Sequence, residues 1–101
     1  MKGSGDKIAC LNPNTGRKMN IDADIYSRFS KAIFRILKEN KPGISFSDMV
    51  NGVKQCFKME NKSFKGSFGW YTVTVKHDME AKGLIETYMK KGKKLHRLRT
   101  R

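Results

Sequence analysis

Apolar residues recur at helical spacing in three segments of the chain. Over residues 23–39 they form a stripe broad enough to face a core, made of Ile25, Phe29, Ala32, Ile33, Ile36 and Leu37. Over residues 46–59 they stand at offsets of 0, 3, 4, 7, 10 and 11 from Phe46. Over residues 68–82 they return every three or four positions between Phe68 and Met79. The pattern predicts three amphipathic helices at these positions.

Residues suited to helix ends flank these segments. Asp22 or Asp24 can cap the first helix, and Ser45 and Ser67 can accept hydrogen bonds from the first-turn N–H groups of the second and third. Gly83 can adopt the left-handed conformation that commonly closes a helix. The ends of the three helices are therefore marked in the sequence.

Two further segments predict β-hairpins. Residues 7–21 contain two short runs, 7–11 and 17–21, around a cluster of turn formers. Residues 84–99 contain runs at 84–88 and 95–99, joined by a cationic segment that includes Gly92. We expect the first hairpin to be a flap over the helices, with an arm reaching a groove or a partner as the alternative. Ile44 can form a very short strand beside the second hairpin.

The junction of the third helix and second hairpin resembles a known family. Met79 to Glu86, Met-Glu-Ala-Lys-Gly-Leu-Ile-Glu, resembles the point where the third helix of winged helix-turn-helix domains enters the wing. Residues 69–85 are also similar to a small bacterial group of unassigned function with this fold. The resemblance covers roughly residues 23–99. It implies an α+β fold: a single winged helix-turn-helix domain of three helices and a small antiparallel sheet, with a basic wing and a short N-terminal hairpin. Regulation of transcription follows by analogy only.

Length and composition predict one domain over residues 7–99. A chain of 101 residues with 38% hydrophobic content can build a single core. Residues 1–6 are expected to be disordered or a cloning remnant, and residues 100–101 to end a basic tail. No stretch has the length of a membrane span, and the amino terminus lacks the apolar stretch of a secretory signal. A cytoplasmic protein without membrane contact is expected.

The charge of the chain favours a polyanionic partner. Its 22 basic and 9 acidic residues give a net charge of +13, and such an excess destabilises the compact state by self-repulsion. The last twenty positions hold eight basic residues and one acid, Glu86. The sequence therefore predicts binding to nucleic acid, with duplex DNA first and structured RNA sharing the same charge signature.

Candidate contact residues fall in three places: the approach to the third helix, its outward face, and the wing. At a helix start, backbone donors and the dipole favour an anion; the outward face would meet a major groove; cations at a hairpin tip gain affinity by releasing counterions. The candidates are Lys62, Lys65, Ser67, Trp70, Thr74, His77, Lys90, Lys91, Lys93, Lys94, Arg97 and Arg99. The alternatives are a solvated loop before the helix and a solubilising charge run in the wing.

The outward face of the third helix is poorly suited to reading bases. Arg, Lys, Asn and Gln make the bidentate contacts that separate base pairs, whereas Thr74 and His77 offer single hydrogen bonds. An exposed Trp70 beside Val73 is also typical of a protein contact. A rival hypothesis is therefore a protein-interaction module, whose apolar surface would consist of Trp70, Val73, Tyr26 and Phe34.

No constellation for catalysis or metal binding stands out in the sequence. Cys10 and Cys56 have no partner at metal-ligand spacing, which predicts reduced thiols. His77 and Asp78 are helical neighbours that point about 100° apart, so they do not form an oriented acid–base pair. We expect no enzyme activity, no metal and no cofactor. A homodimer and a protein partner both stay open.

Overall fold

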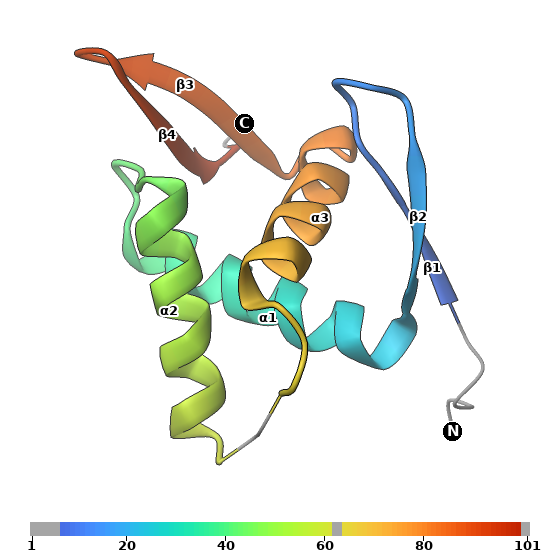
Figure 1. Cartoon of the computed structure of the whole chain (residues 1–101). Helices are drawn as coiled ribbons and strands as arrows, with labels where there is room; N and C mark the ends of the chain where they lie inside the picture. The colour runs from blue at the N-terminus through green and yellow to red at the C-terminus, as the bar shows by residue number, and fades with distance from the viewer. Residues whose placement is uncertain (1–6, 62–63, 100–101) are drawn as a thin grey trace.

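Three helices and two β-hairpins form this protein in a computed structural model, which describes residues 7–61 and 64–99. The elements are β1 (Lys7–Leu11), β2 (Lys18–Asp22), α1 (Ala23–Glu39), α2 (Phe46–Met59), α3 (Phe68–Ala81), β3 (Ile85–Lys90) and β4 (Lys93–Leu98) (Figure 1). The predicted α+β class with three helices is confirmed. Residues 1–6, residues 100–101 and Lys62, all named in the predictions, lie outside the described residues. Within the described ranges, no helix combines the length and apolar character needed to cross a membrane.

An aromatic cluster holds the three helices together. The ring of Phe29, on α1, lies 5.0 Å from the ring of Phe57 on α2 and 5.6 Å from that of Tyr71 on α3. Phe64, from the connection between α2 and α3, lies 5.1 Å from Phe29. Aromatic pairs of this kind contribute about 0.5–1.5 kcal/mol each beyond the area they bury. Phe64 therefore anchors the connection between α2 and α3 to the core.

The helix ends largely follow the capping residues. Ser67 accepts a hydrogen bond from the N–H of Trp70 (3.1 Å), and Ser45 accepts one from the N–H of Asp48 (3.2 Å). Gly83, at φ +78°, follows the end of α3 in the left-handed region. Asp22 behaves differently: it is the last residue of β2 and the N-cap residue of α1, but it makes no side-chain capping bond.

The N-terminal hairpin covers one side of the helices. β1 and β2 pair antiparallel, with Lys7 opposite Asp22 and Leu11 opposite Lys18. Cys10 and Ile21, one from each strand, are buried in the core. Figure 1 shows α3 between this hairpin and α2. The hairpin is therefore a flap over the helices, as the first of the two interpretations predicts.

The C-terminal hairpin, β3–β4, projects beyond the end of α3 (Figure 1) and is called the wing below. Ile44 bridges it as the sequence suggests: its N–H donates to the carbonyl of His96 (3.0 Å), and the N–H of His96 donates to the carbonyl of Ile44 (2.8 Å). The strands are longer than predicted. Lys90, Lys93 and Lys94, assigned to the joining segment from the sequence, lie in β3 and β4, because a tight turn at Lys91–Gly92 connects the strands.

Candidate nucleic-acid interface

The start of α3 places two of the candidate residues at the surface. Lys65 is exposed, and Ser67 is the N-cap residue of the helix. The Ser67 oxygen accepts the bond from the Trp70 N–H, so its own hydroxyl hydrogen can still be donated to an anion. The helix start thus combines a cation, a hydroxyl donor and the positive end of the helix dipole.

The outward face of α3 offers few groups for hydrogen bonding. Trp70 is 41% exposed, and its ring lies edge-on to Tyr71 with centroids 4.8 Å apart. The hydroxyl of Thr74 donates to the carbonyl of Trp70 (2.8 Å), so its hydrogen is used inside the helix. Burial lowers the pKa of the half-buried His77, and the charge of Lys76 adds to the shift. This face can stack on or cover a ligand better than it can read bases.

Asp78 is a buried anchor on the side of α3 that faces the flap. Its carboxylate accepts hydrogen bonds from the N–H of Leu11 (3.0 Å) and the hydroxyl of Tyr26 (2.6 Å), and it pairs with Lys82 (2.7 Å). Burial alone would raise the pKa of Asp78, but the bonds from Lys82, Tyr26 and Leu11 outweigh it and hold the pKa below its usual value. Burial, followed by the bond to Asp78, raises the pKa of Tyr26 to about 12. One carboxylate therefore joins β1, α1 and α3.

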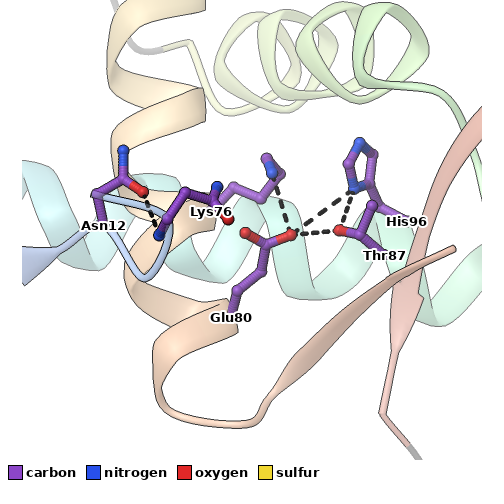
Figure 2. Close-up of polar contacts among 6 residues, drawn as sticks. Asn12, Lys76, Glu80, Thr87 and His96 are labelled. Atoms are coloured by element: carbon purple, nitrogen blue, oxygen red, sulfur yellow. Dashed lines mark hydrogen bonds and ion pairs between the residues drawn. The ribbon is translucent and has the colours of Figure 1, made fainter. Parts of the chain in front are cut away.

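A second polar network connects α3 to the wing (Figure 2). Lys76 pairs with Glu80 (3.1 Å), Thr87 donates its hydroxyl hydrogen to Glu80, and Thr87 contacts Nδ1 of His96 (2.8 Å). Because the Thr87 hydrogen goes to Glu80, Thr87 accepts from the Nδ1–H of His96. Burial lowers the pKa of His96 to about 4, and Lys76 adds to the lowering. His96 is therefore neutral and buried at neutral pH, where it bonds to Thr87.

Four lysines crowd the tip of the wing, and all are exposed. Lys90 and Lys93 lie directly opposite each other across the strands, an arrangement that is destabilising for like charges. Lys91 has φ +51° and Gly92 has φ +81°, as a two-residue hairpin turn requires. A non-glycine residue in the left-handed region costs about 1 kcal/mol. The wing tip thus keeps lysines at positions where they cost stability.

The two candidate arginines of the wing differ in their surroundings. Arg97 pairs with Glu86 at 2.5 Å and lies over the ring of Tyr88, 4.2 Å from its centroid. Its charge is therefore already offset within the wing. Arg99 is exposed and donates its backbone N–H to the carbonyl of Leu84 (2.9 Å). Arg99 therefore lies at the base of the wing, at the other end of the strands from the lysines of the tip.

The turn of the flap and the wing lie on either side of the C-terminal half of α3. A cleft of about 240 Å³ lies between them, lined by Pro13 and Asn14 of the flap, His77 of α3, and Thr87 and Lys94 of the wing, among others. The sequence did not indicate this neighbour for His77, because the flap and α3 are far apart in the chain. If α3 enters the major groove of a duplex, its N-terminal half, with Trp70 and Thr74, is therefore more accessible than the half beside the flap.

These features define an α+β domain of three helices with a covering N-terminal hairpin and a cationic wing. The sequence model of a family of unknown function, DUF6958, matches residues 7–95, so the chain belongs to that family. The match begins at β1 and ends within β4, and it includes all three helices and the wing tip. No curated protein and no solved structure matches the chain.

Proposed function

We propose that this protein binds nucleic acid, duplex DNA first, as a winged helix-turn-helix domain whose wing makes the principal contact. The single observation that carries the proposal is the wing tip, where Lys90, Lys91, Lys93 and Lys94 surround Gly92. A polyanion would offset the repulsion between these lysines and release its own counterions. In this proposal the protein works in the cytoplasm.

The order of elements supports the winged-helix part of the proposal. The chain runs through α1, the bridge at Ile44, α2, α3 and then the wing, and Ile44 pairs antiparallel with His96 of β4. In winged helices the third helix lies beside a wing of this kind, so a duplex can contact both together. The network that joins Lys76, Glu80, Thr87 and His96 fixes the wing relative to α3.

The contact would be made mainly with phosphates. Lysines at the tip of a hairpin reach phosphate oxygens, and phosphate contacts position a protein on the backbone without carrying sequence information directly. Trp70, exposed at the start of α3, would stack on or wedge beside a base, and Lys65 and Ser67 would contact phosphates at the same end. Base specificity is therefore expected to be modest, and transcriptional regulation is the role that the fold suggests by analogy.

The test is a titration of a fluorescein-labelled, random-sequence DNA duplex at several salt concentrations, followed by anisotropy and Trp70 fluorescence. The wild type should bind with an affinity that falls steeply as salt rises. Changing Lys90, Lys91, Lys93 and Lys94 to Gln should weaken binding at low salt by about 100-fold or more. The slope of log K against log salt should become shallower by roughly 3 to 4, since each phosphate contact contributes about 0.9.

The matched control removes the same charge from exposed lysines of α1, α2 and the turn between them: Lys38, Lys41, Lys54 and Lys58 to Gln. This variant should lose less than about tenfold in affinity. Absence of binding by the wild type at low salt, or equal losses in the two variants, would reject the proposal. Tighter binding of an RNA duplex than of DNA would reject the choice of DNA.

The exposed ring of Trp70 favours one alternative, a protein dock on α3. The four residues that were assigned to this surface from the sequence do not form one patch. Tyr26 and Phe34 line a groove on α1, and Trp70 and Val73 do not line it. Trp70→Ala distinguishes the two functions. It should weaken DNA binding if Trp70 contacts DNA, and loss of the edge-on contact with Tyr71 should lower the free energy of unfolding by about 0.5–1.5 kcal/mol in either case. Wild-type DNA affinity in this variant would leave Trp70 to a protein partner.

A further inference from the structure

A groove lies on the side of α1 that meets the α3–β3 junction. It has a volume of about 550 Å³, and its floor includes Phe34, Met79 and Leu84 together with Tyr26. Phe34 is 45% exposed and Leu84 is 44% exposed, so two large apolar side chains share one open depression. Exposed apolar side chains gathered in one concave surface are typical of a binding site.

The groove is elongated. Its lining residues on α1 extend from Tyr26 to Lys38. At a rise of 1.5 Å per residue these positions span about 18 Å, or roughly three helical turns. A compact small molecule would fill only part of this length. An amphipathic helix of about three turns would match it, with apolar side chains entering at i, i+3, i+4 and i+7.

The rim of the groove is cationic. Lys31, Arg35, Lys38 and Lys82 all line it. Lys82 is paired with Asp78, and Arg35 with Glu39 at 3.5 Å. Lys31 and Lys38 make no ion pair with any described residue. Two exposed cations on α1 therefore stand beside an apolar floor with their charges not offset by the residues described.

We propose that this groove binds an acidic amphipathic helix of a protein partner. The floor would take the apolar stripe of that helix, and Lys31 and Lys38 would pair with carboxylates on its flank. A second copy of this chain fits poorly, because it would bring another +13 against a cationic rim. Nucleic acid fits poorly as well, because phosphates gain nothing from an apolar floor.

The groove and the wing tip are built from different residues, so the two contacts are separable. The groove is formed by α1, the end of α3 and Leu84, and the lysines of the wing tip do not line it. The proposal therefore goes beyond nucleic-acid binding and does not depend on it. A domain with both sites would connect a polyanion to an acidic protein.

The test uses a fluorescein-labelled probe peptide of about 14 residues, with Leu and Phe at i, i+3, i+4 and i+7 and Glu on both flanks. Anisotropy should show binding to the wild type. Lys31→Glu with Lys38→Glu should weaken binding by about tenfold or more, because the change replaces attraction with repulsion. Lys90→Glu with Lys94→Glu changes the net charge equally and should weaken binding less than about threefold.

A second pair of variants tests the apolar floor. Phe34→Ala should weaken binding of the probe by about tenfold, whereas Met59→Ala, which removes a 72% exposed side chain at the end of α2, should have no effect. Circular dichroism and thermal unfolding would show that all four variants are folded.

Three outcomes would overturn the proposal. The first is no binding of the probe at about 1 mM, or equal binding of a scrambled peptide of the same composition. The second is equal loss of affinity in the groove and wing variants, which means non-specific attraction. The third is a wild-type dimer in sedimentation velocity that Phe34→Ala dissociates, which assigns the groove to a second copy.

Discussion

The two hairpins share a topology and differ in where they are attached. In the flap, both strands contribute buried residues, Cys10 and Ile21, and Leu11 at the end of β1 bonds to Asp78. In the wing, the buried residues Ile85 and His96 lie in the half of the strands nearer the base, and the tip consists of Gly92, exposed lysines and the exposed Met89. The flap is held against the helices along its length. The wing is held as far as His96 and Tyr88, which bond to Ile44 and Pro42, and only its tip reaches outward.

The turns of the hairpins show the same contrast. The turn of the flap is closed by its own hydrogen bonds: Asn12 donates its backbone N–H to the carbonyl of Arg17 (2.9 Å), and Gly16 donates to the carbonyl of Asn12 (2.7 Å). The turn of the wing puts Lys91 in the left-handed region between two facing lysines. One turn stabilises the fold, and the other keeps charge at the surface at some expense of stability.

Breaking the attachment of the flap should have the largest effect on stability. Asp78→Ala leaves the N–H of Leu11 and the hydroxyl of Tyr26 without their acceptor, and it removes the partner of Lys82. Since each unsatisfied buried donor costs about 1–3 kcal/mol, the free energy of unfolding should fall by about 3 kcal/mol. Urea denaturation of the wild type and the variant measures this difference in the free energy of unfolding.

The control for the flap is Asp24→Ala, which breaks an exposed i,i+4 pair with Arg28 on α1. It should cost less than about 0.5 kcal/mol. A loss of under about 1 kcal/mol for Asp78→Ala would mean that apolar burial of Cys10 and Ile21, and not the carboxylate, holds the flap.

The base of the wing should respond to pH. His96 has a pKa lowered from 6.5 to about 4 by burial, with Lys76 contributing, so the unfolded chain binds a proton more readily than the folded one. Stability is therefore complete above about pH 6.5 and falls as the pH drops toward 4, by about 2 kcal/mol between pH 7 and pH 5. His77, whose pKa is also lowered, acts in the same direction.

The variants His96→Asn and His77→Gln separate the two histidines. In His96→Asn the introduced side-chain amide would replace the Nδ1–H donor without titrating, so the slope of unfolding free energy against pH should flatten. The slope should change little in His77→Gln. Asp78 does not contribute to the change in stability between pH 7 and pH 5. Its pKa is lowered in the folded protein, so it affects stability only as the pH falls below the ordinary pKa of an aspartate, near 4. An unchanged slope in His96→Asn would assign the acid sensitivity elsewhere.

The sequence predicts the helices well because their signals are local. Apolar spacing and the caps at Ser45 and Ser67 depend on residues within one or two turns, and both appear in the structure. Gly83 closes α3 and Ile44 pairs with the wing, as expected. The sequence underestimates the length of the wing strands, because lysines are poor strand formers. In the structure, the tight turn at Gly92 extends the pairing to Lys90.

The sequence did not predict burial of the polar residues Lys76 and Asp78 of α3, because the segments that cover them are distant in the chain. Spacing along α3 identifies only the face toward α1 and α2, whereas Asp78 is covered by the flap and Lys76 is bonded to Glu80, which joins the wing. The opposite charges at i,i+4 in Asp78–Lys82 and Lys76–Glu80 were a signal in the sequence that could have indicated ion pairs on this side of α3. Whether the candidate contact residues bind nucleic acid stays a prediction.

The smallest predicted effect concerns the wing tip alone. Lys93→Gln removes the like charge opposite Lys90 and should raise the free energy of unfolding by about 0.5 kcal/mol at low salt. Lys18→Gln is its counterpart in the flap, where the residue opposite is Leu11, and it should change stability by less than half as much. Urea denaturation at about 0.01 M and 1 M salt measures both, and the gain from Lys93→Gln should disappear at the higher concentration because the charges are then screened within about 3 Å. If Lys93→Gln destabilises the domain at low salt, the facing lysines are not a source of strain, and the contrast between a stabilised flap and a strained wing rests on Lys91 alone.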